Sequence, residues 1–216
     1  MKSNKVKRLL AATLAATMMM ATALTAAASG GSGGSTGAST STEASTESAA
    51  PEVKTSAAGA TVNIAGMKIA TTVAGVYSAK SVQGMAVITP ADTLKASLGL
   101  TGSQTPYIVA FDTDPKKSNK AMACVDAATT ALGGTFVTAL NIDLAAKNNG
   151  KVVKLANGSA AMLTGLPKGA DMTKTYYVVC VQPGGIITIL EDQDVSPATV
   201  TFEIKAGLGT YAIVAR

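Results

Sequence analysis

Histidine and tryptophan are both absent from this 216-residue chain, which has only two cysteines. The lack of histidine excludes Ser-His-Asp and Cys-His catalysis and the histidine-based zinc and iron sites. Two cysteines are too few for a four-cysteine metal site. Aromatic residues make up 4% of the chain, so few side chains are present on which sugars or single-stranded bases could stack. We therefore assign no catalytic residues and expect a protein without enzymatic activity.

Phosphate-binding motifs are missing as well. No P-loop is present, and no dinucleotide-binding glycine pattern follows a predicted strand. The sequence also has no cationic surface suited to nucleic acid, because four of its 18 basic residues lie in residues 2–8. The rest of the chain then holds 14 basic and 13 acidic residues. Binding to nucleic acid needs a cluster of cations along one surface, so we expect none.

The first 28 residues have the pattern of a secretory signal peptide. A basic start is followed by an uncharged segment over residues 9–28, which ends in Ala26–Ala28. A charged start, an apolar run and a small-residue end are typical of a cleavable export signal. We therefore expect Sec-type export, cleavage after Ala28 and a location outside the cell or in the cell envelope.

Retention of this segment is the alternative, since about 20 uncharged residues can just span a bilayer. Contact with a membrane is expected only in that case. No cysteine follows the small residues, and no sorting motif or apolar tail follows Val214. Any tether is therefore expected at the N-terminus or to be non-covalent, with envelope components or another extracellular protein as candidate partners.

Residues 29–60 form a tract of serine, threonine, glycine and alanine without hydrophobic periodicity. Such a composition cannot bury enough apolar surface to offset the entropy of ordering the chain. We predict a disordered linker in this range, followed by folded structure from Thr61 onward.

Residues 61–150 alternate between strand and helix patterns. The strands are expected at residues 61–64, 68–73, 85–88, 107–111 and 136–144. One helix is expected to begin with Thr89 as its cap and Pro90 in its first turn, with Asp92 closing a capping box, and to run to about Leu98. A second helix is expected to begin at Asp114 and to end before Gly133. This pattern favours a mixed sheet with two helices.

After Gly150 the pattern is of strands alone. They are expected at residues 151–155, 159–163, 175–182, 186–190, 198–204 and 210–214. Asn149-Gly150 and Pro183-Gly184 are typical of tight turns. Residues 176–181 are apolar on both alternating faces, which indicates a central strand covered on both sides. The predicted fold class is α+β, mainly β, with a mixed sheet and two helices followed by a small antiparallel β-sandwich over residues 151–216.

The order of motifs in residues 151–216 resembles a known family. The motifs are the loop Leu166–Asp171, the strand at residues 176–179, the proline-glycine turn, and the closing segments at residues 200–202 and 210–214. Together they resemble the small Ig-like, ZU5-like β-sandwich modules of extracellular proteins of Gram-positive bacteria. The resemblance implies a fold and a location outside the cytoplasm, and it implies no chemistry.

Two groups of acidic residues are the candidates for a site. Asp112 and Asp114 are two apart, so on a strand their carboxylates would stand roughly 7 Å apart on one face. That spacing suits an acid-base pair or a calcium ion, although Asp114 can equally cap a helix. Glu191, Asp192 and Asp194 form an acidic loop that could bind calcium, but it lacks the glycine and final glutamate of an EF-hand. We therefore expect no cofactor, with calcium at these residues as the alternative.

Cys124 and Cys180 are candidates for a disulfide, because an even number of cysteines in an exported protein indicates pairing. Against this, Cys124 lies near the apolar stripe of a predicted helix and Cys180 lies in a buried strand, where cysteine packs as a small hydrophobic residue. Both states remain open at this point.

Three functions remain compatible with the sequence. The first is a secreted or envelope-associated, non-enzymatic module that binds a partner or has a structural role. The alternatives are a small hydrolase that uses the acidic residues named above and a carbohydrate-binding module. An enzyme requires carboxylates that meet in a cleft, whereas a binding protein requires an exposed groove or apolar patch.

Overall fold

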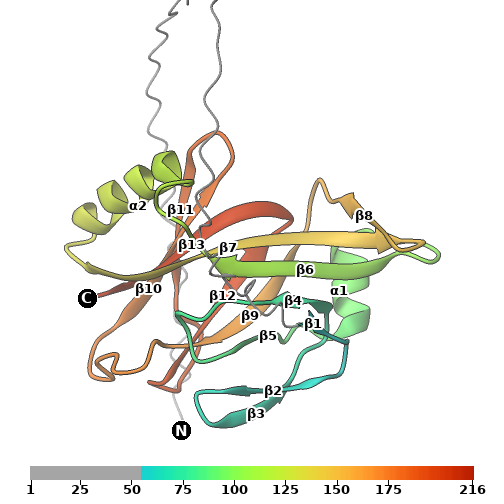
Figure 1. Ribbon diagram of the computed structural model, residues 1–216, viewed down its shortest axis with the longest axis horizontal. Coiled ribbons are helices and arrows are strands. Elements are labelled where there is room, and N and C mark those ends of the chain that lie inside the picture. The colour runs from blue at the N-terminus through green and yellow to red at the C-terminus, as the bar shows by residue number, and fades with distance from the viewer. Residues whose placement is uncertain (1–54) are drawn as a thin grey trace, which may run out of the picture. The chain divides into compact units, whose positions relative to one another are not determined.

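The computed structural model describes residues 55–216 (Figure 1). The predicted signal peptide and most of the predicted linker lie outside the described residues. Strands dominate the described part, together with two helices. The expected fold class, α+β and mainly β with a mixed sheet, is confirmed.

The elements have the following bounds. The helices are α1 (Ala91–Ser97) and α2 (Asn119–Ala131). The strands are β1 (Thr55–Ser56), β2 (Thr61–Ile64), β3 (Met67–Ala70), β4 (Ala74–Tyr77), β5 (Met85–Val87), β6 (Thr105–Asp112), β7 (Thr135–Asn148), β8 (Lys151–Lys154), β9 (Ser159–Gly165), β10 (Tyr176–Gln182), β11 (Ile186–Glu191), β12 (Thr199–Lys205) and β13 (Gly207–Ala215).

The strands form three sheets. The largest has eight strands in the order β1-β4-β6-β7-β13-β10-β11, with β8 also paired to β7. The second has the order β12-β9-β5, and the third is the hairpin β2-β3. In the largest sheet β4 and β6 are parallel, and the other pairs are antiparallel.

Residues 151–216 do not form a sandwich by themselves. They contribute β8, β10, β11 and β13 to the eight-stranded sheet and β9 and β12 to the three-stranded sheet, where β7 and β5 from the earlier part of the chain are among their partners. The expected boundary after Gly150 falls in the tight turn between β7 and β8. The earlier and later parts of the chain therefore share both sheets.

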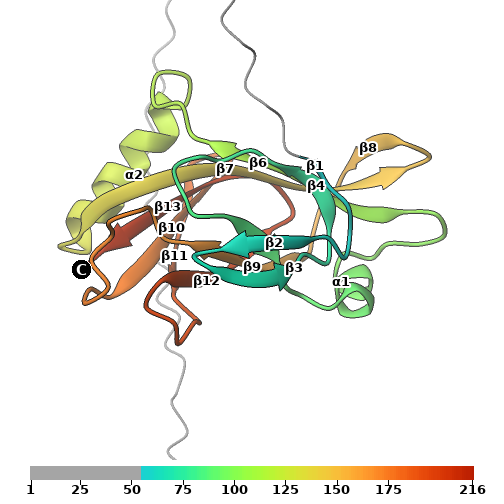
Figure 2. The same ribbon diagram turned by 60° about the horizontal axis from the view of Figure 1, so that its bottom comes forward.

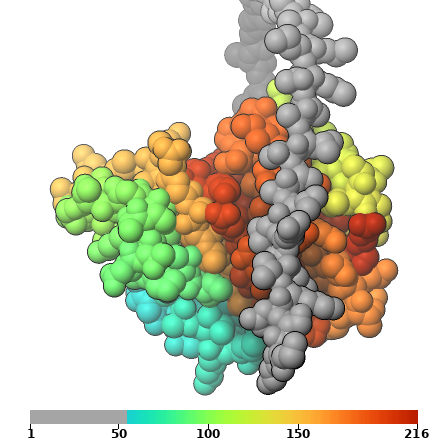
Figure 3. Space-filling model, turned by 180° about the vertical axis from the view of Figure 1, so that it is seen from behind, coloured from blue at the N-terminus to red at the C-terminus, as the bar shows by residue number. Residues whose placement is uncertain are grey.

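The layers of the fold can be followed in Figure 2. Three apolar clusters hold them together. The largest lies between the eight-stranded and three-stranded sheets and includes Phe202, Tyr211 and Ile213. A second lies between α2 and the outer face of the eight-stranded sheet. The third packs β2-β3 against the outer face of the three-stranded sheet through Ile64 and Leu163. In the view from behind, the cyan residues of this hairpin lie at the bottom of the described part (Figure 3).

β10 is covered on both faces, as its sequence predicts. Val178 and Cys180 belong to the cluster between the sheets, whereas Val179 and Val181 belong to the cluster under α2. Alternate residues of a strand point to opposite faces, so a strand that is apolar throughout fits between two apolar layers.

The two turns that the sequence predicts are present. Asn149 and Gly150 both have positive φ, at 49° and 78°, which is the conformation of the hairpin turn that Asn-Gly favours. In the turn between β10 and β11 the N–H of Gly185 donates to the carbonyl of Gln182 at 3.1 Å. Gly184 has φ of 88° there, the positive value that the third residue of a type II turn needs.

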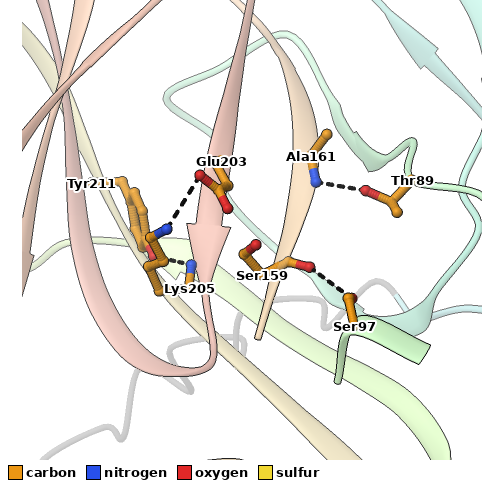
Figure 4. Close-up of polar contacts among 7 residues, drawn as sticks. All are labelled: Thr89, Ser97, Ser159, Ala161, Glu203, Lys205 and Tyr211. Carbon is orange, nitrogen blue, oxygen red and sulfur yellow. Dashed lines mark hydrogen bonds and ion pairs between the residues drawn. The ribbon is translucent and has the colours of Figure 1, made fainter. Parts of the chain in front are cut away.

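The structure corrects the predicted start of α1. The N-cap residue is Pro90, and no side chain makes a capping hydrogen bond. Thr89 instead accepts a hydrogen bond from the N–H of Ala161 in β9 at 2.6 Å (Figure 4). The Thr89 hydroxyl thus ties the helix start to the three-stranded sheet, and the predicted capping box with Asp92 does not form.

Two further boundaries differ from the prediction. α2 begins at Asn119 rather than Asp114, because residues 114–118 form a turn in which Ser118 N–H donates to the Asp114 carbonyl at 2.9 Å. The predicted linker ends too late, since β1 pairs with β4 and Gly59 N–H donates to the Thr71 carbonyl at 2.7 Å. Backbone pairing needs no apolar side chain, so composition does not reveal it.

The corner between β12 and β13 carries the chain from one sheet to the other. Tyr211, 1% exposed, packs its ring against Phe202 with centroids 5.6 Å apart. Its hydroxyl accepts a hydrogen bond from the N–H of Lys205 at 2.8 Å (Figure 4). One side chain thus joins the last residue of β12 to the middle of β13.

Candidate functional site

Asp112 and Asp114 do not form a site together. Asp112 ends β6, and its carboxylate accepts hydrogen bonds from the N–H groups of Lys80 and Ser81, at 2.8 and 3.1 Å. Asp114 accepts from the N–H of Lys116 at 3.0 Å and lies 3.7 Å from the ammonium of Lys117. Each carboxylate therefore fixes a different piece of backbone.

The acidic loop after β11 is also held by internal hydrogen bonds. Asp192 accepts from the N–H groups of Asp194 and Thr201, both at 2.9 Å. Asp194 accepts from the Thr199 hydroxyl and from the N–H groups of Val195 and Ser196. These contacts fasten the loop that begins at the end of β11 to the start of β12.

The two carboxyl groups of this loop differ in their pKa. Burial raises the pKa of Asp192, and its backbone hydrogen bonds offset this only in part. Burial also acts to raise the pKa of Asp194, but the hydrogen bond from Thr199 and those from the backbone outweigh it and hold that pKa below its ordinary value. A carboxylate accepting several hydrogen bonds is stabilised in its charged form.

Within residues 55–216, no three histidine, cysteine, aspartate or glutamate side chains lie together as a metal site would require. Glu191, at the end of β11, is exposed. The acidic candidates thus show structural roles, and they do not converge on one cleft.

The two cysteines are free, so the disulfide considered from the sequence does not form. Cys180 belongs to the cluster between the two sheets, whereas Cys124 packs in the cluster under α2. These clusters lie on opposite faces of the eight-stranded sheet, which separates the sulfur atoms. Burial raises the pKa of Cys180 to about 11, with a partial offset from its hydrogen bond with Tyr211, so this thiol is not a reactive one.

A groove of about 530 Å³ lies beside the first turns of α2. Its floor is a row of residues, each the register partner of the next across β6, β7, β13 and β10. They are Phe111, Asn141, Thr210 and Val181. One wall is formed by the N-cap residue Ser118 and by Lys120, Ala121 and Cys124 of α2. The other walls are formed by the turn Gln182–Gly185 and by Leu208 and Gly209. We call this hollow the α2 groove.

The position of α2 explains why the groove exists. The helix packs Val125 and Ala128 onto the neighbouring row of the sheet, which contains Ala139, Ala212 and Val179. Two alanines in that row let the helix approach closely. The helix begins only at Asn119, so its first turn borders the row of Asn141 without covering it. Figure 1 shows α2 beside the β10-β11 hairpin, whose turn forms another wall.

The floor of the α2 groove holds a buried polar pair. Asn141 is 9% exposed and Thr210 is 6% exposed. The Thr210 hydroxyl donates to the side-chain oxygen of Asn141 at 2.7 Å, and the Asn141 amide donates to the Ser118 hydroxyl at 3.4 Å. This chain of bonds connects β13, β7 and the start of α2 at the bottom of a largely apolar hollow.

Large apolar side chains are exposed on the floor and at the rim of the groove. Phe111, on the floor, is 40% exposed, and Leu208, at the rim, is 50% exposed. Pro183 and Ala121 also line the groove. An exposed apolar surface beside a few fixed polar groups is the usual composition of a small-molecule site. The α2 groove has this composition.

A second hollow of about 590 Å³ lies between β2, β4 and residues 78–85. Its tyrosine is already engaged, because the Tyr77 hydroxyl bonds the Thr71 hydroxyl at 2.8 Å and the Val73 carbonyl at 2.9 Å. Burial raises the pKa of Tyr77 to about 12, although the hydrogen bond with Thr71 lowers it in part. The Tyr77 hydroxyl is therefore satisfied within the protein and does not need a ligand as a partner.

Of the residues that line the α2 groove, the sequence predicts a role only for Cys124, as a disulfide candidate, and for the proline-glycine turn. Asn141 carries a further local signal. It is an amide within a strand of buried residues, and such a group needs a polar partner.

No helix in residues 55–216 is long and apolar enough to cross a membrane. Comparison with protein-family models found no matching family, and comparisons with curated proteins and with solved structures found no match either. The likeness of residues 151–216 to Ig-like modules therefore stays a prediction.

Proposed function

We propose that this chain is an exported, non-enzymatic binding protein that holds a small, largely apolar ligand in the α2 groove. The observation that carries the proposal is the row Phe111, Asn141, Thr210 and Val181, which α2 leaves open. A hollow of about 530 Å³ lies within the range of roughly 300–1,000 Å³ that is typical of ligand sites.

The hydrolase alternative has less support. Two carboxylates that act together must share a cleft at a fixed separation, whereas Asp112, Asp192 and Asp194 are engaged by backbone groups at two different places. Among the described residues, none that lines the α2 groove is acidic.

Binding can be tested with Nile red, a neutral apolar dye that fluoresces when it leaves water. We expect saturable binding by the wild-type protein and at least tenfold weaker binding by Ala121→Phe, because the new ring fills the groove. Ala123→Phe is the matched control, since Ala123 lies on the same helix, is exposed and does not line the groove. Phe111→Ser removes an exposed apolar side chain from the floor and should also weaken binding.

Circular dichroism establishes that each variant is folded. Equal dye binding by the wild type, Ala121→Phe and Phe111→Ser would refute the groove as a site, as would the absence of binding by the wild type.

Export is the second part of the proposal and rests on the basic start and the uncharged segment that ends at Ala28. N-terminal sequencing of the protein recovered from the medium or the envelope should begin at Ser29. Recovery only as a membrane species that retains Met1 would refute cleavage.

A further inference from the structure

We propose that the ligand of the α2 groove is an amphipathic carboxylic acid, whose carboxylate binds at the first turn of α2 and whose hydrocarbon part covers exposed apolar side chains that line the groove. This inference rests on the proposed function, because it specifies the ligand of that same groove. Four features of the groove support it.

The first feature is the charge of the groove. Lys120 is the one charged side chain among the described residues that line it. The ion pairs in residues 55–216 join Lys117 to Asp114 and Lys205 to Glu203, so Lys120 has no acidic partner there. An ammonium group beside an apolar surface, without a fixed counter-ion, attracts an anion.

The second feature is the N-terminus of α2. The N-cap residue Ser118 makes no side-chain capping bond, and the first turn contains no acidic residue. The N–H groups of Asn119, Lys120 and Ala121 have no acceptor within the described residues. Because these groups carry the positive end of the helix dipole, they add to the field of Lys120 at the same end of the groove.

The third feature is the balance of donors and acceptors on the floor. The side-chain oxygen of Asn141 accepts from Thr210, and the Ser118 hydroxyl accepts from Asn141. This leaves the Ser118 O–H and the second amide hydrogen of the nine-tenths buried Asn141 without an acceptor among the described residues. An ionised carboxylate only accepts, so it matches a site that has spare donors.

The fourth feature is the apolar length of the groove. Phe111 and Val181 lie at the two ends of the floor, with Asn141 and Thr210 between them. Leu208 and Pro183 also line the groove. A ligand that satisfied only the polar end would leave these exposed apolar side chains in water. A hydrocarbon chain attached to the carboxylate covers them.

The proposal can be tested with three eight-carbon probes that differ only in the head group: octanoate, octanol and octylammonium. Each is titrated at pH 7 against Nile red bound to the wild-type protein. We expect octanoate to displace the dye at a concentration at least tenfold lower than octanol, and octylammonium to be the weakest. The preference for octanoate over octanol should decrease with added salt, because the attraction is electrostatic and partly exposed.

Two charge reversals locate the carboxylate. Lys120→Glu should weaken octanoate at least tenfold while octanol stays within twofold. Lys68→Glu is the matched control, since Lys68 is an exposed lysine of β3, outside the groove, and it should leave all three affinities unchanged. Lys120→Met removes the charge without reversing it and should reduce the preference for octanoate over octanol by less than Lys120→Glu does.

The outcomes separate the two proposals. If octanol and octanoate displace the dye equally, or if Lys120→Glu preserves the preference, the carboxylate inference is wrong while the groove still binds apolar ligands. If the wild type binds neither the dye nor any probe, the proposed function and this inference are both wrong. A preference for octylammonium would contradict the charge argument directly.

Discussion

The hydroxyl of Tyr211 is a single group whose removal tests how the two sheets are joined. In Tyr211→Phe the ring still fills its buried place beside Phe202, but the N–H of Lys205 loses the acceptor that it has at 2.8 Å. A buried donor left without a partner costs about 1–3 kcal/mol. Lys205 is half-buried, so we expect the lower part of that range, about 1–2 kcal/mol. For a domain of this size the loss corresponds to a decrease in Tm of about 2–8 °C.

Urea unfolding followed by circular dichroism measures this change as a lower midpoint at an unchanged slope. Tyr107→Phe is the control. Tyr107 is half-buried, and the contact recorded for it is with the Lys147 ammonium, 3.7 Å from the ring centre, which a phenylalanine ring can also make. Its stability should stay within about 0.5 kcal/mol of the wild type. If the two variants lose the same stability, the hydrogen bond at the corner contributes nothing of its own.

Three further predictions concern other parts of the fold. Deletion of residues 210–216 should leave the chain unfolded, because it removes Tyr211 and Ile213, each worth about 2–5 kcal/mol, from a total of about 5–15 kcal/mol; a chain ending at Gly209 that melts like the full chain would contradict this. The pKa of Asp194 is held below its ordinary value. The ionised carboxylate therefore stabilises the fold fully at a pH above that ordinary pKa, and this stabilisation is lost as the pH falls through the folded-state pKa. Asp194→Asn should therefore lose less stability in acid than the wild type does. If the Tm of both proteins falls equally as the pH is lowered, this prediction is wrong. A maleimide reagent should modify Cys124 in the native protein and Cys180 only after unfolding; equal rates in the native state would show that the eight-stranded sheet does not shield Cys180.

The sequence predicts those features of the fold that depend on neighbouring residues. The residues of β10 by themselves predict a strand buried on both faces, and the turns at Asn149-Gly150 and Pro183-Gly184 follow from the backbone conformations that those residues favour. The failures involve distant partners. Thr89 has the composition of a cap, but the N–H of Ala161, 72 residues away, takes its hydroxyl instead. The pairing of β13 with β7 has no local signature at all.

The candidate site cannot be predicted from the sequence for the same reason. Its floor depends on the register that places Asn141 opposite Thr210, residues that are 69 positions apart. Leu208 lies between two glycines and resembles a turn residue, whereas in the structure it belongs to β13 and forms part of the rim. The acidic residues are candidates for a site because a cluster of charges can be recognised in a sequence. Their actual partners are backbone N–H groups, which every sequence contains.

The place of β13 has a consequence for how the protein reaches its folded state. β13 follows all the other strands along the chain, yet it lies between β7 and β10 in the middle of the largest sheet. Until it arrives, both neighbours present an open edge of unpaired backbone groups and apolar side chains, which is the kind of edge that pairs with other copies and aggregates. The contacts of β13 with β7 span a long stretch of sequence, and contacts of this kind form slowly. The newly made protein is therefore most vulnerable in the interval before its last strand inserts, and its yield should depend on how long that interval lasts and how crowded the surroundings are.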